Sequence, residues 1–321
     1  MKNQYIAALL AVFLCCISSF AQTSRVNFTA PLFYPEGTSY DPAKKIFFVS
    51  SVRTGTIGSV DEKGAFKVFY QDKSLKSSYG MEVDTKRNML WVCTGDANYS
   101  ILSDSATYKK MIRLIGLDLN TGAKKHDIDL SSLIAGKHFA NDLAIDDKGN
   151  IYITDSYSPV VYKVDPAMKP SVFAKSDWFK SEDVGLNGIE WSPEGFLIVA
   201  HNTNGQLFKI DLAQPENISK VKMTTFFPGA DGLIWNTDKS LVLIQNKGVN
   251  KAFQLVSKDK WQSAELQGYT LLEDRLHHPT TATMSMGKIY TLNSKMNELS
   301  DPTAPPSKEF SLQLVRFVAA K

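Results

Sequence analysis

The sequence has almost no cysteine with which to cross-link a fold. It contains three cysteines, and two of them, Cys15 and Cys16, lie close to the amino terminus. The third, Cys93, lies within an apolar run, where a free thiol behaves as a small hydrophobic side chain. A single cysteine cannot form an internal disulfide bond, so we expect the fold to depend on its hydrophobic core.

The sequence also lacks an apolar run at its start that is long enough to span a membrane. Residues 6–14 are apolar, but a membrane helix needs roughly 20 such residues. Lys2 precedes this run and Ser19-Phe20-Ala21 offers a small-x-small cleavage site after it. The pattern predicts a signal peptide over residues 1–21 and a single domain over residues 22–321. We therefore expect a secreted or periplasmic protein with no membrane part after cleavage.

Two alternatives concern the same amino-terminal segment. The first is a short membrane anchor, which the length of the apolar run disfavours. The second is a lipoprotein anchor at Cys15 or Cys16, which Val12-Phe13-Leu14 disfavour because a lipoprotein site needs small residues before its cysteine. Cleavage after Ala21 would remove both cysteines.

Strong charge and several well-known motifs are missing as well. The formal net charge is +3 and no long basic run occurs, which argues against nucleic-acid binding. No glycine-rich loop joins a strand to a helix, which argues against nucleotide binding. Ser192 and Ser285 lack the Gly-x-Ser-x-Gly context of a nucleophilic serine.

The chain does contain a repeat of short apolar strands. Six of them align, at Ile46–Ser50, Met89–Thr94, Asn150–Thr154, Phe196–Ala200, Ser240–Gln245 and Lys288–Leu292. Equivalent residues in successive strands are 43, 61, 46, 44 and 48 residues apart. A period of roughly 40–50 residues built from strands is typical of β-propellers. We predict an all-β, six-bladed β-propeller whose functional site lies at the mouth of its central channel.

The ends of the chain and two insertions complete this prediction. The sixth blade has no evident outer strand, and we expect Ser24–Thr29 to supply it and close the ring. An outer strand of the fourth blade is predicted at Val221–Phe226. The long segments Asp96–Arg113 and Ser294–Ser307 are predicted to be loops that cover part of one face.

Polar residues recur where the first strand of each blade begins. The lead residues of the six blades are Glu36, Tyr79, Asn141, Asn187, Asp231 and Pro279. Symmetry brings equivalent positions together around one axis, and four of the six carry side-chain oxygens. Carboxylate and amide oxygens without histidine or cysteine suit a hard cation, so we predict a divalent cation, Ca²⁺, bound by Glu36, Asn141, Asn187 and Asp231. The alternative is that these residues only cap turns.

The same residues resemble a known family. Glu36-Gly37, Asn141-Asp142, Asn187-Gly188 and Asp231-Gly232 are similar to the motifs of the senescence marker protein / gluconolactonase family, over about residues 34–317. More remotely the chain resembles paraoxonases and strictosidine synthases. The resemblance implies a metal-dependent hydrolase of a lactone or other ester, with Glu36, Asn187 and Asp231 on the metal. It also implies that Asn141 faces metal and substrate, and that Asp231 is the general base.

One position departs from the family pattern. Sugar lactonases of the family carry an arginine two residues before the first asparagine, and this chain has Phe139 there. An aromatic ring cannot donate hydrogen bonds to sugar hydroxyls, so an aldonolactone substrate is in doubt. We expect Phe139, Tyr79, Asn141 and His278 to contact the substrate.

Other aromatic and histidine residues leave alternatives open. Phe33, Tyr34 and Trp235 are also predicted near the axis, either in the core or lining a pocket. Histidine is an alternative base because its pKa lies near neutrality. The candidates are His277 or His278 and, with less support, His138 or His201.

Two functions of different classes therefore remain. One is a monomeric, secreted or periplasmic hydrolase acting on a small lactone or ester. The other is a ligand-binding propeller without catalysis, in which the calcium ion is structural. Fold resemblance alone does not choose between them.

Overall fold

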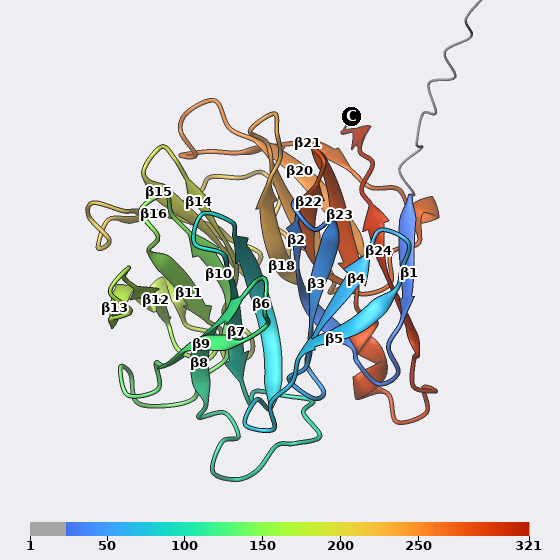
Figure 1. Ribbon diagram of the computed structural model, residues 1–321. Helices are drawn as coiled ribbons and strands as arrows, with labels where there is room; N and C mark the ends of the chain where they lie inside the picture. Colours follow the sequence, from blue (N-terminus) through green and yellow to red (C-terminus); the bar gives the residue numbers. More distant parts are fainter. Residues whose placement is uncertain (1–23, 321) are drawn as a thin grey trace, which may run out of the picture.

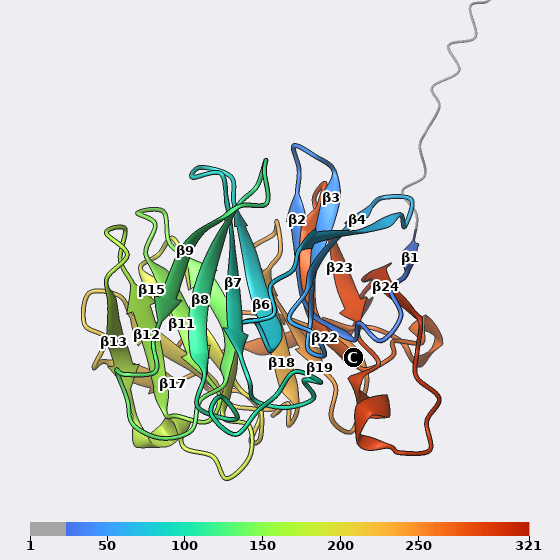
Figure 2. The ribbon, with the colours of Figure 1, turned by 60° about the horizontal axis from the view of Figure 1, so that its bottom comes forward.

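The predicted fold class is confirmed by the arrangement of the sheets. The computed structural model describes residues 24–320, so the predicted signal peptide with Cys15 and Cys16 lies outside the described residues. Six antiparallel sheets surround one axis and form a six-bladed β-propeller (Figures 1 and 2). Over residues 24–320, no helix has the length and apolar character needed to cross a bilayer.

Each blade contains four strands, which are given below in order from the axis outwards. The inner strands are β2 (Pro35–Asp41), β6 (Ser77–Asp84), β10 (Ala140–Ile145), β14 (Leu186–Ser192), β18 (Ala230–Trp235) and β22 (Pro279–Ser285). The second strands are β3 (Ile46–Ser51), β7 (Met89–Gly95), β11 (Ile151–Asp155), β15 (Phe196–His201), β19 (Leu241–Gln245) and β23 (Lys288–Asn293). Inner strands of adjacent blades contact one another, and β2 contacts β22 to complete the circle.

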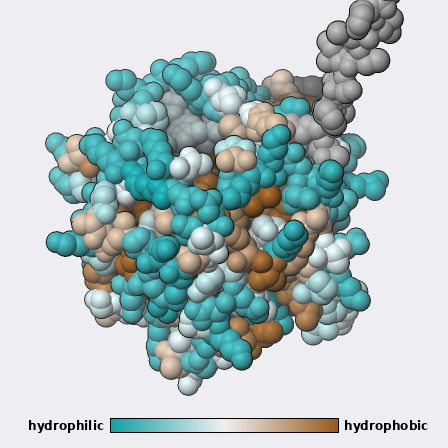
Figure 3. Space-filling model, viewed as in Figure 1, coloured by the Kyte–Doolittle hydropathy of each residue, from teal (hydrophilic) through white to brown (hydrophobic). Residues whose placement is uncertain are grey.

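The outer half of each blade is more exposed. The third strands are β4 (Ile57–Asp61), β8 (Ile112–Asp118), β12 (Val160–Val164), β16 (Leu207–Asp211), β20 (Lys251–Val256) and β24 (Glu309–Leu314). The outer strands are β5 (Phe66–Tyr70), β9 (Lys124–Asp129), β13 (Pro170–Lys175), β17 (Ile218–Lys220), β21 (Glu265–Tyr269) and β1 (Arg25–Thr29). A short strand, β25 (Val318–Ala319), and three 3₁₀ turns, η1 (Asp177–Phe179), η2 (Leu272–Asp274) and η3 (Met296–Ser300), complete the elements. On the face of the molecule that is turned to the viewer in Figure 1, the surface is mainly hydrophilic, with apolar residues in small separate groups (Figure 3).

The second strands are apolar on both faces because each is covered by a blade on either side. In β3, Phe47 packs against Tyr290 of the sixth blade, with ring centroids 5.7 Å apart. The next residue, Phe48, points the other way, into a core shared with Leu90 of the second blade. Successive side chains of a strand point to opposite faces, so one continuous apolar run fills two inter-blade cores.

The amino-terminal strand closes the ring, as the sequence predicts. β1 pairs antiparallel with β24 and becomes the outer strand of the sixth blade, as its position beside β24 in Figure 1 shows. Phe28 on β1 packs against Phe66 of the first blade and Phe310 of β24. The two ends of the chain thus share one sheet, and no edge is left open between the first and last blades.

Phe28→Ala is expected to lower the free energy of unfolding by about 3–5 kcal/mol, the usual effect of truncating a buried phenylalanine. Phe28 is only 2% exposed and joins two blades. Thr29→Ala, on the exposed face of the same strand, should change it by less than about 0.5 kcal/mol. Denaturant unfolding of the two variants checks this, and equal small effects would mean that β1 does not hold the ring closed.

Two strand predictions near the rim are wrong in register. The outer strand of the fourth blade is β17, at Ile218–Lys220, and the predicted strand Val221–Phe226 is not formed. Val221 is instead buried in the core between the fourth and fifth blades, and that burial explains its apolar character. The apolar pattern of the sequence also predicts the third strand of the sixth blade at Leu312–Phe317, but β24 spans Glu309–Leu314, and Val315 and Phe317 pack beside a neighbouring core.

Candidate functional site

A β-bulge at the start of every inner strand directs one side chain towards the axis. The pairing of the inner and second strands shifts register once in each blade, at Pro35/Thr38, Ser78/Met81, Ala140/Leu143, Leu186/Ile189, Ala230/Leu233 and Pro279/Ala282. In five blades the shift spans the predicted lead residue. In the sixth blade Pro279 is itself paired with Asn293 and the shift begins after it, so the predicted lead residue is one position too early. Bulges re-aim side chains at the point where they occur, and Glu36, Tyr79, Asn141, Asn187 and Asp231 meet at one mouth of the channel.

The glycines after the lead residues permit close packing of neighbouring inner strands. A Cβ atom on Gly37 would overlap the carbonyl oxygen of Tyr79, and one on Gly188 would overlap that of Asp231. Neither glycine has a positive φ. Glycine is therefore needed here because it has no side chain, and not because the backbone turns sharply. Any side chain at these positions would force two blades apart.

Five of the six lead residues, all but Pro279, line a cavity of about 400 Å³, here named the mouth pocket. All the residues predicted for the site lie in its wall: Glu36, Tyr79, Phe139, Asn141, Asn187, Asp231 and His278. Asn98, Tyr99, Asn202, Asn246, Met296 and Ser300 are among its other lining residues. The structure thus brings together every residue that the sequence assigned to the cation or to the substrate.

Two buried carboxylates that form no ion pair in the described structure face this pocket. Glu36 and Asp231 are each 6% exposed. Within residues 24–320 the Glu36 carboxylate forms no hydrogen bond, whereas Asp231 accepts hydrogen bonds from the side-chain amides of Asn246 and Asn187, and the charge of Lys247 acts on it as well. Burial, with repulsion from nearby carboxylates, raises the pKa of Glu36 well above its usual range and that of Asp231 to about 8. Burying an ionised carboxylate lowers the stability of the folded state unless a positive charge is paired with it.

Amide oxygens around the carboxylates also lack partners. The Oδ1 atoms of Asn187 and Asn202 are buried and form no hydrogen bond in the described structure. The amide nitrogen of Asn141 donates to the hydroxyl of Ser156 at 2.9 Å, which fixes the orientation of that side chain. Buried oxygen atoms without a hydrogen-bond partner are rare in folded proteins, and a bound ion is one reason for their presence.

These donors fit a hard divalent cation. The set contains carboxylate and amide oxygens, the ligands that Ca²⁺ prefers, and it leaves room for water or substrate oxygens. No cluster of three or more His, Cys, Asp or Glu side chains able to hold a metal occurs between residues 24 and 320. Such clusters are typical of zinc sites. A cation bound by oxygen atoms needs ligands that are free to coordinate it. The Oδ1 atoms of Asn187 and Asn202, which have no hydrogen-bond partner, and the carboxylate of Glu36, which has no ion-pair partner, meet this need.

Asn202 is a site residue that the sequence prediction missed. It follows β15 directly and lies fifteen residues after Asn187. The same spacing separates Asn141 from Ser156 and Asp231 from Asn246, and both of those pairs are hydrogen-bonded. In those two blades the residue after the second strand supports the lead residue, whereas the amide nitrogen of Asn202 donates to the carbonyl of Ala230 at 2.8 Å. The fifteen-residue spacing is the signal that could have identified Asn202.

Aromatic side chains form one wall of the mouth pocket. Tyr79 and Phe139 have ring centroids 4.7 Å apart, and Tyr157 follows Phe139 at 5.5 Å. Tyr79 is fixed because its hydroxyl accepts a hydrogen bond from the backbone N–H of Ala97. This wall is aromatic, and the ring of Phe139 offers no hydrogen-bond donor to the pocket.

The two predicted loops cover the mouth, as Figure 2 shows for the loop before β8 and the segment that contains η3. Tyr99 from the first loop and Ser300 from the second are linked by a hydrogen bond of 3.1 Å between their hydroxyls. At the rim, Lys247 forms an ion pair of 2.9 Å with Asp183. Access to the pocket is therefore bounded by surface contacts that are easily broken.

The structure separates the candidate histidines. His278 lines the pocket, and burial lowers its pKa to about 4, so it is neutral at physiological pH. His138 is buried beside Asp155, with Nδ1 2.7 Å from the carboxylate, and does not line the pocket. His201 is likewise buried, within hydrogen-bonding distance of the carbonyl of Lys180, and His277 lies outside the pocket lining.

Three aromatic residues predicted near the axis do not line this pocket. Phe33 and Tyr34 are buried in the core below the first blade. Trp235 lies at the far end of β18, and so at the opposite mouth of the channel. The prediction did not distinguish the two ends of an inner strand, which are about 20 Å apart for six or seven residues.

The comparisons with known proteins bear on the fold. No protein-family model matches the sequence, and no curated protein matches it either. Among solved structures, the major allergen Mala s 1 of Malassezia sympodialis is similar, with a TM-score of 0.73 at 17% identity over 92% of this chain and 97% of that one. A candidate gluconolactonase has a TM-score of 0.60 at 14% identity, over 92% and 94% of the two chains.

A third similar structure is that of an enzyme named for another reaction than the gluconolactonase. It is a streptogramin B lyase, with a TM-score of 0.57 at 13% identity over 91% of this chain and 97% of that one. At these identities the similarity establishes a shared propeller fold. Because propellers of this shape carry unrelated reactions, the function has to be argued from the side chains of the mouth pocket.

Proposed function

We propose that this protein is a secreted or periplasmic, metal-dependent hydrolase of a lactone or other carboxylic ester. The observation that carries the proposal is the mouth pocket itself, where two buried carboxylates without an ion-pair partner and two unsatisfied amide oxygens converge. Glu36, Asn141, Asn187 and Asp231 would hold a divalent cation, Ca²⁺ in this proposal. A cation bound there supplies Lewis-acid polarisation of the ester carbonyl.

The protein's own groups would provide the proton transfer and the orientation of the substrate. Asp231 would take a proton from the attacking water, and its hydrogen bond from Asn246 holds the carboxylate in place. Asn141, fixed by Ser156, would donate to or accept from the substrate. His278 is neutral and buried in the same wall, where it would contact the substrate without carrying charge.

The walls favour an apolar acyl or alcohol group over a sugar. Phe139 and Tyr79 present aromatic surface, and the cation at the rim, Lys247, is already paired with Asp183. A panel of aryl esters and aliphatic and sugar lactones, assayed with Ca²⁺ and with chelator, tests the proposal. We expect metal-dependent turnover of aryl esters or aliphatic lactones; no turnover of any of them would remove the hydrolase proposal.

Phe139→Leu is expected to lower kcat/KM for an aryl ester by about 3- to 10-fold, the effect of losing an aromatic contact of about 0.5–1.5 kcal/mol. Turnover of a small aliphatic lactone should change little, because it makes no ring contact. The ratio of the two values of kcat/KM in the variant and the parent protein is the measurement. An unchanged ratio would show that Phe139 does not contact the substrate.

A ligand-binding propeller without catalysis remains the second candidate. The contact between Tyr99 and Ser300 across the mouth favours it, because a closed mouth retains a ligand and hinders turnover. Ca²⁺-dependent thermal stabilisation without hydrolysis of any ester would favour this second function.

A further inference from the structure

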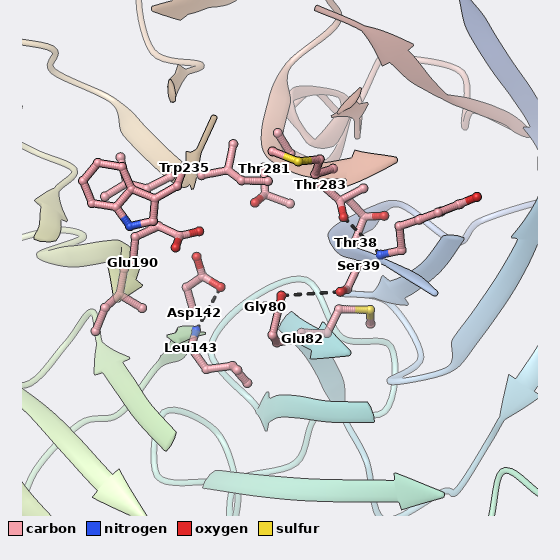
Figure 4. Close-up of a pocket in the computed structure, with 17 residues that line it drawn as sticks. Thr38, Ser39, Gly80, Glu82, Asp142, Leu143, Glu190, Trp235, Thr281 and Thr283 are labelled. Atoms are coloured by element: carbon pink, nitrogen blue, oxygen red, sulfur yellow. Dashed lines mark hydrogen bonds between the residues drawn. The ribbon is translucent and has the colours of Figure 1, made fainter. Parts of the chain in front are cut away.

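The opposite mouth of the channel has a space of its own. A cavity of about 250 Å³ lies inside the channel (Figure 4), and one of about 490 Å³ adjoins it where β10, β14 and β18 end. Both are lined by Glu82, Leu143, Glu190 and Trp235, so they are neighbours, and the two together are here named the far cavity. It shares no lining residue with the mouth pocket.

Three carboxylates face the far cavity. In Figure 4 the side chains of Asp142 and Glu190 point into the same space, and Glu82 lies across it. The Glu190 carboxylate forms no hydrogen bond or ion pair within residues 24–320, and Glu82 accepts only a long contact of 3.4 Å from Ser39. Removal from bulk water inside the channel, together with repulsion from neighbouring carboxylates, raises the pKa of Glu82 and Glu190.

Little positive charge balances these acids. Of the described residues that line the far cavity, Lys239 is the one cationic side chain, and it is exposed at the outer edge. Glu194 adds a further carboxylate to the same edge. Acidic side chains therefore outnumber basic ones among the described residues that line the space, and a bound cation would favour their ionised form.

Tryptophan side chains form the other wall. Three of the five tryptophans of the chain, Trp191, Trp235 and Trp261, line the far cavity. The indole N–H of Trp235 donates to the carbonyl of Trp191 at 2.8 Å, and the Trp261 ring packs edge-on against Trp235 at 5.1 Å. These contacts hold Trp235 in one orientation, and Trp191 and Trp235 remain half-exposed to the cavity.

We propose that the far cavity binds an organic cation, an amine or quaternary ammonium compound, with its charge near Glu190 and Glu82 and its apolar groups on the tryptophans. Indole faces attract weakly hydrated cations, and a carboxylate beside them adds to the attraction. A metal ion would instead need a shell of oxygen donors, whereas indole rings occupy one side of this space. The volume of about 490 Å³ accommodates a small organic molecule.

Titration with choline and with its neutral isostere 3,3-dimethylbutan-1-ol, followed by calorimetry and tryptophan fluorescence, tests the proposal. We expect choline to bind at least about tenfold more tightly than the neutral alcohol, the factor that about 1.4 kcal/mol of charge-dependent attraction gives. Glu190→Gln and Trp235→Leu should each weaken choline binding by about tenfold. Trp178→Leu, at an exposed tryptophan outside the far cavity, is the matched control that should leave it unchanged.

Four results would overturn the proposal. The first three are no binding of choline at millimolar concentration, equal affinity for choline and the neutral alcohol, and binding that neither Glu190→Gln nor Trp235→Leu weakens. Displacement of choline by Ca²⁺ in the Glu36→Gln protein would also contradict it, since that result would show a metal site in the far cavity. Glu190→Gln is nearly isosteric, so its melting temperature should stay within a few degrees and separate a binding effect from unfolding.

Discussion

Asp231→Asn is expected to lower metal-dependent ester hydrolysis by at least about 10³-fold while the propeller stays folded. The substitution removes both the proposed general base, whose loss typically costs 10²–10⁴-fold, and one negative charge from the cation site. Asparagine has nearly the same shape and can still accept the hydrogen bond that Asn246 donates. The measurement is kcat/KM on whichever ester the parent protein hydrolyses best, at saturating Ca²⁺.

The control for this variant is Asp183→Asn. Asp183 also lines the mouth pocket, but it lies exposed at the rim and is paired with Lys247. An exposed ion pair contributes at most about 1 kcal/mol, so this variant should retain activity within about fivefold. Full activity in Asp231→Asn would remove Asp231 from the mechanism, and equal losses in both variants would point to a general change in the electrostatics of the pocket.

Removal of the metal is expected to make stability fall as pH rises. In the metal-free protein the pKa of Asp231 is raised to about 8 and that of Glu36 is raised as well, so the folded state holds protons that the unfolded chain releases near pH 4. Between pH 4 and 8 the unfolded state therefore binds fewer protons than the folded state. The stabilisation is fully present below pH 4 and is lost as pH approaches 8, at up to about 1.4 kcal/mol per pH unit for each carboxyl.

Calcium should reverse this dependence. A cation on the two carboxylates keeps them ionised in the folded state, so at pH 8 a hundredfold excess of Ca²⁺ over its dissociation constant should add about 2.7 kcal/mol. Denaturant unfolding at pH 5 and pH 8, with chelator and with Ca²⁺, measures both effects. In Asp231→Asn the metal-free protein should lose less stability over this range, because one of the two raised carboxyls is gone. Stability that rises with pH in chelator would contradict the account.

The repeat made the fold predictable. Apolar second strands such as those that contain Phe47 and Leu197 recur with a period that only a few architectures produce. Equivalent positions in a closed ring must approach one axis, so the meeting of Glu36, Asn187 and Asp231 could be predicted from the spacing of the repeat alone. Pairing of the first strand with the last blade followed from the same closure.

Other features depend on tertiary packing that local sequence does not encode. Val221 is apolar because it fills a core between two blades, and its sequence alone resembles a strand. Gly37 is needed because a carbonyl of the next blade lies against it, and no periodicity in the sequence reports that approach. Asn202 became recognisable only when the hydrogen bonds of Asn141 and Asp231 revealed a fifteen-residue spacing.

The central claim is that the mouth pocket binds a divalent cation through its ring of lead residues. Calorimetric titration of the chelator-treated mature protein with Ca²⁺ at pH 7.5 tests it most directly, alongside Glu36→Gln and Asn187→Leu. We expect one Ca²⁺ per chain, with protons released on binding because the carboxyl pKa values are raised in the metal-free state. Each variant should weaken this binding by at least about tenfold. No heat of binding in the parent protein, or Ca²⁺ binding that neither variant alters, would contradict the claim.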